Sequence, residues 1–259
     1  MGVLDRFRLD GKRLFITSGS RGLGREMALA VADAGADVVL TGRDQRSLEK
    51  TAADIHALGR KAWPIQADMS EPSASETTCT KALEDYGPFD ILINNVGGRR
   101  DPTPVQEMPV ETWRSLVDLN LTSTFICTKI IGGAMAAGKG GRVINIASIN
   151  AFVAGRNIGG RHYESAKAAV VQFTRATAAD WAPQGITVNV ICPGVFMTEP
   201  NQRWAREWPE VIDGIKERTP MAAFGEPEDL GPLAVYLASD ASRFMTGATL
   251  VIDGGYTLW

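Results

Sequence analysis

The chain has few residues of the kinds that form disulfides or bind zinc. Its 259 residues include three cysteines and two histidines. Cys79, Cys127 and Cys192 are odd in number and far apart in the sequence, so we expect buried or free thiols in a reducing compartment rather than a disulfide framework. With only His56 and His162 as histidines, we expect no metal site.

Strong positive charge and long apolar runs are also missing. The formal net charge is −3, whereas nucleic-acid-binding domains are usually strongly basic, so we expect no nucleic-acid partner. No apolar stretch is long enough to span a bilayer, and the charged start MGVLDRFRLDGK lacks the apolar core of a signal peptide. Arg6 breaks the N-myristoylation pattern. These features predict a cytoplasmic protein without a membrane partner.

What the chain does contain is a regular alternation of short β-branched segments with longer helical patterns. Strands are expected at residues 12–17, 37–41, 61–66, 89–94, 141–148, 185–192 and 249–253, with helices between them. This order predicts a single α/β domain over residues 1–259, doubly wound, with a seven-stranded parallel sheet and helices on both faces. The irregular segment 194–226 interrupts the order and is either a substrate lid or a peripheral insertion.

A glycine-rich segment directly follows the first expected strand. In TSGSRGLGRE, Gly19, Gly22 and Gly24 lie between that strand and the next helix. Glycines here allow a tight turn, and they let backbone N–H groups and the positive end of the helix approach a pyrophosphate. Glycines also serve ordinary turns, but the position after the first strand favours dinucleotide binding.

The end of the second strand indicates which dinucleotide binds. An NAD-binding chain usually places an acidic residue there, roughly 20 residues beyond the loop, to hold the ribose 2′-hydroxyl. Here Gly42 and Arg43 occupy that place, and Arg21 lies inside the glycine-rich loop. Guanidiniums bind a 2′-phosphate through charge-assisted hydrogen bonds, so we expect NADP(H) to be preferred over NAD(H). The alternative is that both arginines are solvated surface charges, and the nearby Asp44 is consistent with that alternative.

The segment HYESAKAAV places Tyr163 and Lys167 four residues apart in an expected helix. Positions i and i+4 lie on the same helix face, so the phenol and the ammonium can be neighbours. A nearby positive charge favours the phenolate and lets a tyrosine exchange a proton closer to neutral pH. Alternatively, the lysine stem simply packs on the ring.

Over essentially its whole length the chain resembles the short-chain dehydrogenases/reductases. TSGSRGLG is similar to the family's TGxxxGxG, with Ser18 in place of the first glycine, NNVG at 94–97 is similar to its NNAG, and CPGVFMT resembles its PGxxxT segment. The resemblance implies a Rossmann-type domain and identifies Asn120, Ser148, Tyr163 and Lys167 as the catalytic tetrad.

The resemblance also implies a set of cofactor contacts. Asp68 matches the acid beside the adenine, and Val195 and Thr198 match the residues that hold the nicotinamide carboxamide. The full set of expected contacts is Gly19, Ser20, Arg21, Gly22, Leu23, Gly24, Arg43, Asp68, Met69, Asn95, Val96, Gly97, Tyr163, Lys167, Pro193, Gly194, Val195 and Thr198.

The mechanism that the resemblance implies interconverts a secondary alcohol and a ketone. In it, Ser148 hydrogen-bonds the substrate oxygen, and Tyr163 donates or removes its proton while the nicotinamide exchanges hydride. Lys167 holds the nicotinamide ribose and biases Tyr163 toward the phenolate. Asn120 is expected to position a water that relays protons to Lys167.

The sequence gives hints of a small polar substrate. Four arginines flank the expected site: Arg99, Arg100, Arg156 and Arg161. They suit an anionic substrate if they line the mouth of the site, but they can also be solvated loop residues. Residues of segment 194–226 that could contact a sugar ring or an acyl chain are Arg203, Trp204, Arg206 and Trp208. The chain is most similar to the branch of gluconate 5-dehydrogenases and related sugar-acid or polyol reductases.

Two alternative functions stay open. In the 3-oxoacyl-[acyl-carrier-protein] reductases, basic residues dock the carrier protein; Lys139 matches one such position, whereas Gln184 replaces another. A non-enzymatic NADP-binding sensor or scaffold is the second alternative, and the intact tetrad argues against it. The resemblance further implies a homotetramer that pairs through its long central helices, including the apolar face of AAVVQFTRATAADW.

Overall fold

Seven parallel strands form one sheet, as the sequence predicts. The computed structural model describes residues 2–98, 100–155 and 159–259. The strands are β1 (Arg13–Ile16), β2 (Asp37–Gly42), β3 (Ala62–Gln66), β4 (Ile91–Asn94), β5 (Gly141–Ile146), β6 (Ile186–Pro193) and β7 (Thr249–Ile252). Every residue of β4 and β6 is buried. Strands covered on both faces in this way become nearly continuous apolar runs, which is how these segments read in the sequence.

The strand order creates a crevice at one point of the sheet. The order is β3-β2-β1-β4-β5-β6-β7, so the chain winds outward from β1 to β3 and then restarts at β4 on the other side of β1. Ile16 pairs with Leu40 of β2 and with Ile93 of β4. In open α/β sheets, ligands bind at such a switch point, outside the carboxyl ends of the strands.

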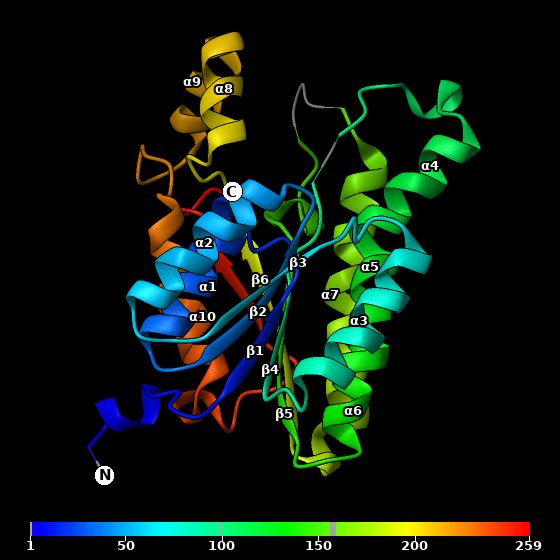
Figure 1. Ribbon diagram of the computed structural model, residues 1–259. Helices are drawn as coiled ribbons and strands as arrows, with labels where there is room; N and C mark the ends of the chain where they lie inside the picture. Colours follow the sequence, from blue (N-terminus) through cyan, green and yellow to red (C-terminus); the bar gives the residue numbers. More distant parts are fainter. Residues whose placement is uncertain (1, 99, 156–158) are drawn as a thin grey trace.

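Helices cover both faces of the sheet (Figure 1). On one face lie α1 (Gly22–Asp33), α2 (Gln45–Ala57) and α10 (Gly231–Ala238), and on the other lie α3 (Pro72–Tyr86), α4 (Val110–Val117), α5 (Ser123–Cys127), α6 (Gly133–Ala136) and α7 (Arg161–Trp181). The apolar core is accordingly divided by the sheet, with Leu14, Ile16 and Met27 on the first side and Phe15, Leu92 and Ile131 on the second. This arrangement agrees with the expected doubly wound α/β class.

The helical region between β4 and β5 contains two irregular turns. Helices α4, α5 and α6 follow one another through two π-helical segments, η3 (Asp118–Thr122) and η4 (Thr128–Gly132). Asn120 lies in the first of these segments. Cys79 of α3 and Cys127 of α5 are free, buried thiols whose Sγ atoms are 3.5 Å apart, so these cysteines are distant only in the sequence.

Segment 194–226 contains more regular structure than its composition suggests. It contains α8 (Glu199–Glu207) and α9 (Pro209–Arg218), which rise above the carboxyl ends of the strands at the upper left of Figure 1. Each helix carries a proline in its first turn, where the missing N–H costs no helical hydrogen bond. Among the described helices, none has the length and apolar character needed to cross a membrane.

Candidate active site

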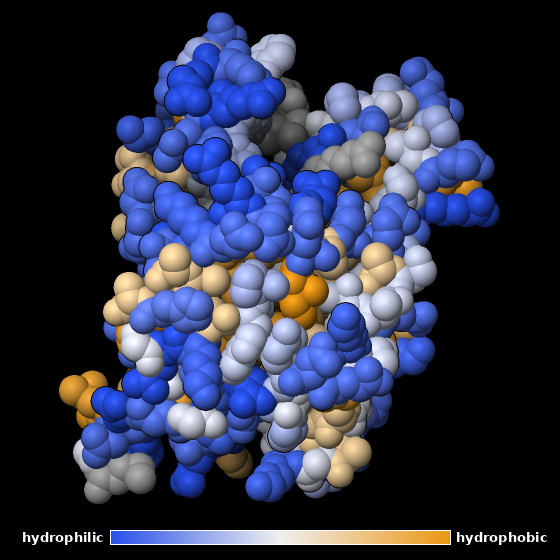
Figure 2. Space-filling view, in the orientation of Figure 1, coloured by the Kyte–Doolittle hydropathy of each residue, from blue (hydrophilic) through white to orange (hydrophobic). Residues whose placement is uncertain are grey.

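A cleft lies at the carboxyl ends of the strands, at the switch point of the sheet. It consists of two adjoining cavities of about 310 and 360 Å³, both lined by Ser18, Arg21, Arg43 and Gly97. Figure 2 shows a hollow at the top of the molecule, between α8 and α9 on one side and α4 on the other, bordered mainly by hydrophilic residues. The second cavity contains Ser148, Tyr163 and Lys167, so the expected catalytic and cofactor residues share one cleft.

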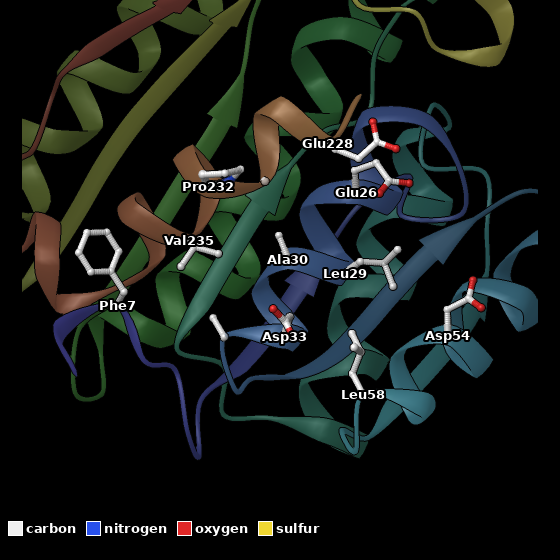
Figure 3. Close-up of a pocket in the computed structure, with 12 residues that line it drawn as sticks. Phe7, Glu26, Leu29, Ala30, Asp33, Asp54, Leu58, Glu228, Pro232 and Val235 are labelled. Carbon is white, nitrogen blue, oxygen red and sulfur yellow. The ribbon is translucent and has the colours of Figure 1, made fainter. Parts of the chain in front are cut away.

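A larger cavity lies elsewhere and has a different character. A groove of about 650 Å³ between α1, α2 and α10 is lined by Leu29, Ala30, Leu58, Pro232 and Val235, with carboxylates at its edge (Figure 3). None of the residues lining it belongs to the expected site. Because this groove is mainly apolar and carries its carboxylates at the edge, the smaller, more polar cleft is the candidate active site.

The glycine-rich loop after β1 adopts the tight turn that the sequence predicts. Gly24 has no room for a side chain, because a Cβ there would lie 2.2 Å from the Ser18 carbonyl oxygen. Ser18, which replaces a glycine of the family motif, has a φ of 55° in the left-handed region. The motif's turn is therefore kept although a serine occupies it. No side chain of the described residues caps the N-terminus of α1 at Arg21, so its first N–H groups can bind a phosphate.

A threonine that the sequence analysis missed joins this loop to the NNVG segment. The hydroxyl of Thr17 accepts hydrogen bonds from the backbone N–H groups of Asn95 (2.9 Å) and Val96 (3.1 Å). The Asn95 side chain in turn donates to the carbonyl oxygens of Thr17 and Ser18. Asn95 thus braces the loop. In the sequence, Thr17 only precedes the glycine-rich loop. That position does not predict its hydrogen bonds to residues that follow β4.

The cofactor residues expected at the ends of β2 and β3 line the first cavity. Arg21 and Arg43 are exposed, and Ser20, Asp68 and Met69 lie beside them. Burial raises the pKa of Asp68, but hydrogen bonds from Ser70 and the charge of Arg43 outweigh it and hold the pKa below its ordinary value. The carboxylate of Asp44 accepts a hydrogen bond from the Ser47 N–H (2.8 Å) and caps α2. Asp44 is therefore the N-cap residue of α2.

Ser148, Tyr163 and Lys167 come from two elements that meet over β6. Ser148 follows β5, and Tyr163 lies in the first turn of α7 with Lys167 one turn later. The Ser148 hydroxyl is close enough to the Tyr163 phenol to favour a lower pKa of the phenol. Lys167 is buried, only 3% exposed, and its Nζ donates to the Ile146 carbonyl oxygen at 2.8 Å. Nζ lies 5.9 Å from the centroid of the Tyr163 ring.

The expected bias of Tyr163 toward the phenolate is not present in this structure. Burial raises the pKa of Tyr163, and the nearby Ser148 hydroxyl and the Arg100 charge offset this effect only in part. Burial also lowers the pKa of Lys167 to about 8. The sequence correctly predicts that the two side chains lie on one face of the helix. It does not show how deeply they are buried, and burial has the largest effect on both pKa values.

Asn120 is buried and holds the backbone beside Lys167. Its Nδ2 donates to the carbonyl oxygens of Leu116 (2.9 Å) and Gly98 (3.1 Å), and its Oδ1 accepts from the Gly98 N–H (2.8 Å). A Cβ on Gly97 would lie 2.7 Å from Lys167 Nζ and 3.1 Å from Asn120 Oδ1. Asn120 and Lys167 therefore both approach Gly97, and the water relay between them stays a prediction.

The remaining expected cofactor residues divide between the cleft and its surroundings. Gly22, Leu23, Pro193, Gly194 and Thr198 line the second cavity. Gly19 lies beneath the loop, where a Cβ would be 3.0 Å from Leu40 Cβ, and Val195 lines a separate apolar cavity. In segment 194–226, Trp208 is exposed and Trp204 is half-buried.

Of the four arginines expected beside the site, Arg100 contacts Tyr163, whereas Arg161 lines a separate cavity. Arg100 stacks on Tyr163, with its Cζ 4.3 Å from the ring centroid. Arg161 instead forms an ion pair with Glu164, with Nη1 2.7 Å from Oε2. Arg99 and Arg156 lie outside the described residues. The described residues also contain no group of three or more His, Cys, Asp or Glu side chains placed to hold a metal ion.

Known proteins are similar to this chain over almost its whole length. A family model described as enoyl-(acyl carrier protein) reductase matches residues 18–257. Galactitol 2-dehydrogenase (L-tagatose-forming) from Cereibacter sphaeroides is 35% identical, with 98% of each chain covered. A 3-oxoacyl-[acyl-carrier-protein] reductase from Synechocystis is 34% identical, covering 94% of this chain and 96% of that protein.

A solved structure extends the likeness to the fold. The gluconate 5-dehydrogenase from Burkholderia cenocepacia, in complex with NADP and tartrate, has a TM-score of 0.91 and is 34% identical, with 100% of each chain covered. The fold, the motifs and these full-length similarities all indicate the same protein family. The chain belongs to the short-chain dehydrogenase/reductase family of oxidoreductases.

Proposed function

We propose that this enzyme interconverts a secondary alcohol and a ketone on a small, polar, anionic substrate such as a sugar acid, with NADP(H) preferred over NAD(H). One observation carries the proposal. Ser148, Tyr163 and Lys167 line the same cleft as the glycine-rich loop and Arg43. A proton donor, its neighbours and a dinucleotide-binding loop at one switch point suit hydride transfer.

The residues of the cleft fit a nicotinamide dinucleotide. The uncapped N-terminus of α1 and the crowded Gly24 suit a pyrophosphate that approaches the backbone closely. Arg21 and Arg43, both exposed, are available for a 2′-phosphate. When bound, the nicotinamide supplies or accepts the hydride.

The chain's own groups would handle the substrate oxygen and its proton. Ser148 donates a hydrogen bond to that oxygen, and Tyr163 gives or takes the proton as the general acid or base. Lys167, whose Nζ donates to the Ile146 carbonyl oxygen, would hold the cofactor ribose. Asn120 would order a water beside Lys167 for proton relay.

Arg100 supports an anionic substrate. Among the expected arginines that the structure describes, Arg100 is the one that contacts Tyr163. Burial lowers its pKa, although Tyr163 and Glu164 favour the charged guanidinium. A partly desolvated guanidinium beside the reacting group suits a carboxylate. Dehydrogenases of galactitol and of gluconate are among the similar proteins, and the gluconate enzyme was crystallised with tartrate, a dicarboxylate.

A 3-oxoacyl-[acyl-carrier-protein] reductase is the second candidate, because a relative of that name matches almost the full chain. The exposed Lys139 suits a carrier protein, whereas Gln184 supplies no charge at the other basic position. A non-catalytic NADP-binding sensor is less well supported, because binding alone needs neither Ser148 nor Tyr163.

We also propose that the enzyme is a cytoplasmic homotetramer. Free, buried cysteines suit a reducing compartment. Phe125 of α5 is 48% exposed and packs edge-on against Phe173 of α7 at a centroid distance of 6.3 Å. An exposed phenylalanine packed on a half-buried one across these two helices suits association with a second copy.

Initial rates with NADPH and with NADH test the proposal against keto-sugar acids, neutral keto-sugars, small diketones and a β-ketoacyl thioester. We expect a keto-sugar acid to be reduced fastest, with NADPH. Reaction of the thioester alone would favour the carrier-protein candidate. Cofactor binding without turnover of any carbonyl compound would favour the sensor.

A further inference from the structure

Arg100 is held by several groups that the tetrad does not include. Its Nη2 donates to Asn150 Oδ1 at 2.6 Å, and its Nη1 donates to the Gly159 carbonyl oxygen at 3.2 Å. The same Nη1 lies 3.8 Å from Glu164 Oε1. The shortest of these contacts is with a neutral amide, so Asn150 contributes most to fixing the guanidinium over Tyr163 without neutralising its charge.

Asn150 also connects Arg100 to the substrate-binding serine. It lies in η5 (Ile149–Ala151), two residues after Ser148, and its backbone N–H donates to Ser148 Oγ at 3.2 Å. Its Nδ2 donates to the Val153 carbonyl oxygen at 3.1 Å, which fixes the orientation of the amide. One residue therefore contacts both Ser148 and the cation above Tyr163.

Glu164 is the group that would capture Arg100 if Asn150 were removed. Its carboxylate already accepts from Arg161 and from the Gly155 N–H (2.8 Å). A guanidinium released from Asn150 can shorten its 3.8 Å ion pair with Glu164 to hydrogen-bonding distance. Such a move would take the positive charge away from the phenol and from an incoming anion.

We propose that Asn150 is a positioning residue: it holds the Arg100 guanidinium over the Tyr163 ring, where this cation lies beside the phenol and stays available to an anionic substrate group. The substrate part of this inference rests on the proposed function. The effect on Tyr163 does not, because it concerns the free protein.

The other ionisable groups around Tyr163 leave this role to Arg100. Lys167 Nζ on α7 lies 5.9 Å from the ring centroid and donates a hydrogen bond to the Ile146 carbonyl oxygen. Cys192 on β6 disfavours the phenolate. Glu164 and Arg161 of α7 are paired with each other. Arg100 is thus the nearest cation among the described residues.

The experiment is a double-mutant cycle on the enzyme without cofactor. Wild type, Asn150→Leu, Arg100→Met and the double variant are labelled with 3-fluorotyrosine, and the resonance of Tyr163, one of four tyrosines, is identified by its loss in Tyr163→Phe. We expect its titration midpoint to move to higher pH in Asn150→Leu and in Arg100→Met. The double variant should match Arg100→Met, because Asn150 acts through Arg100.

Kinetics supply the second measurement. Asn150→Leu should raise KM for a keto-sugar acid about tenfold, as expected for a misplaced charge-assisted hydrogen bond, and leave KM for a neutral ketone nearly unchanged. Phe152→Ala, an exposed change in the same loop, is the matched control and should alter neither the titration nor KM.

The possible results separate the two proposals. Additive effects in the double variant, or a midpoint unmoved by Asn150→Leu, would overturn the role of Asn150 whatever the substrate is. A wild-type enzyme that reduces no carbonyl compound would overturn the proposed function, and the fluorotyrosine titration would still test Asn150.

Discussion

Arg43 Nη1 lies 4.0 Å from Asp68 Oδ2, so the residues that follow β2 and β3 face each other across one cavity. The Arg43 side chain is 69% exposed, and an ion pair this long and this exposed contributes little to stability. The guanidinium is therefore free to exchange this weak contact for a stronger one with a phosphate. The pair also places the expected adenine-side acid beside the expected phosphate-binding arginine.

Arg43→Ala should weaken NADPH binding about 30-fold and change NADH binding little, because it removes charge-assisted hydrogen bonds to the 2′-phosphate alone. Fluorescence titration with each cofactor measures both affinities. Lys50→Ala removes the same charge from the exposed face of α2 and should leave the preference unchanged. Equal affinity of the wild-type enzyme for the two cofactors would contradict the assignment.

Tyr163→Phe should lower kcat by a factor of about 10³ to 10⁴ and leave NADPH affinity nearly unchanged, because it removes one hydroxyl that transfers the proton. Steady-state rates and cofactor titration on the same sample distinguish the two effects. Tyr236→Phe makes the same change on α10, beside Phe7 and away from the cleft, and should turn over normally. Near-normal turnover of Tyr163→Phe would exclude Tyr163 as the general acid.

The sequence predicts the strands and the i, i+4 pair because these depend on local periodicity. It does not predict contacts between separate loops: Arg100 is recognisable as a cation near the site, but its bond to Asn150 depends on how two loops meet. The same holds for Thr17, whose partners follow β4. The sequence predicts a lowered pKa for Tyr163, whereas burial, which is a property of the fold, raises it.

Ser18→Gly should raise the free energy of unfolding by about 0.5–1 kcal/mol, because Ser18 has a φ of 55° where a glycine is less strained. Urea unfolding at one protein concentration measures the change. Ser20→Gly, at a loop position outside the left-handed set, should instead destabilise the protein. A loss of stability in Ser18→Gly would mean that contacts of the serine outweigh its backbone strain.

Phe125→Asp should reduce the assembly to smaller species, because a carboxylate would be buried between two copies of α5. Sedimentation velocity gives the mass. Leu4→Asp places the same charge on an equally apolar exposed position of η1 (Leu4–Phe7) and should leave the assembly intact. A wild-type protein that sediments as a monomer would refute the tetramer.

Lys167→Met should abolish turnover and yet stabilise the enzyme without cofactor at pH 7. Burial lowers the pKa of Lys167 from 10.5 to about 8. At about 1.4 kcal/mol for each pH unit, keeping the ammonium charged in the folded state below pH 8 costs about 3 kcal/mol. Methionine removes this cost but leaves the Ile146 carbonyl oxygen without its donor, which costs about 1 kcal/mol. The expected gain in the free energy of unfolding is therefore about 2 kcal/mol.

The gain in the free energy of unfolding should decrease as the pH rises. Between pH 8 and 10.5 the folded wild-type protein has released the Lys167 proton while the unfolded chain still binds it, so wild-type stability rises with pH relative to the variant. The advantage of Lys167→Met should shrink across this interval and reverse above it. Urea unfolding of both proteins at pH 7, 9 and 10.5 measures the trend. An advantage that grows with pH would mean that Lys167 is stabilised as a cation in the fold, so the lysine would then favour the folded state instead of opposing it.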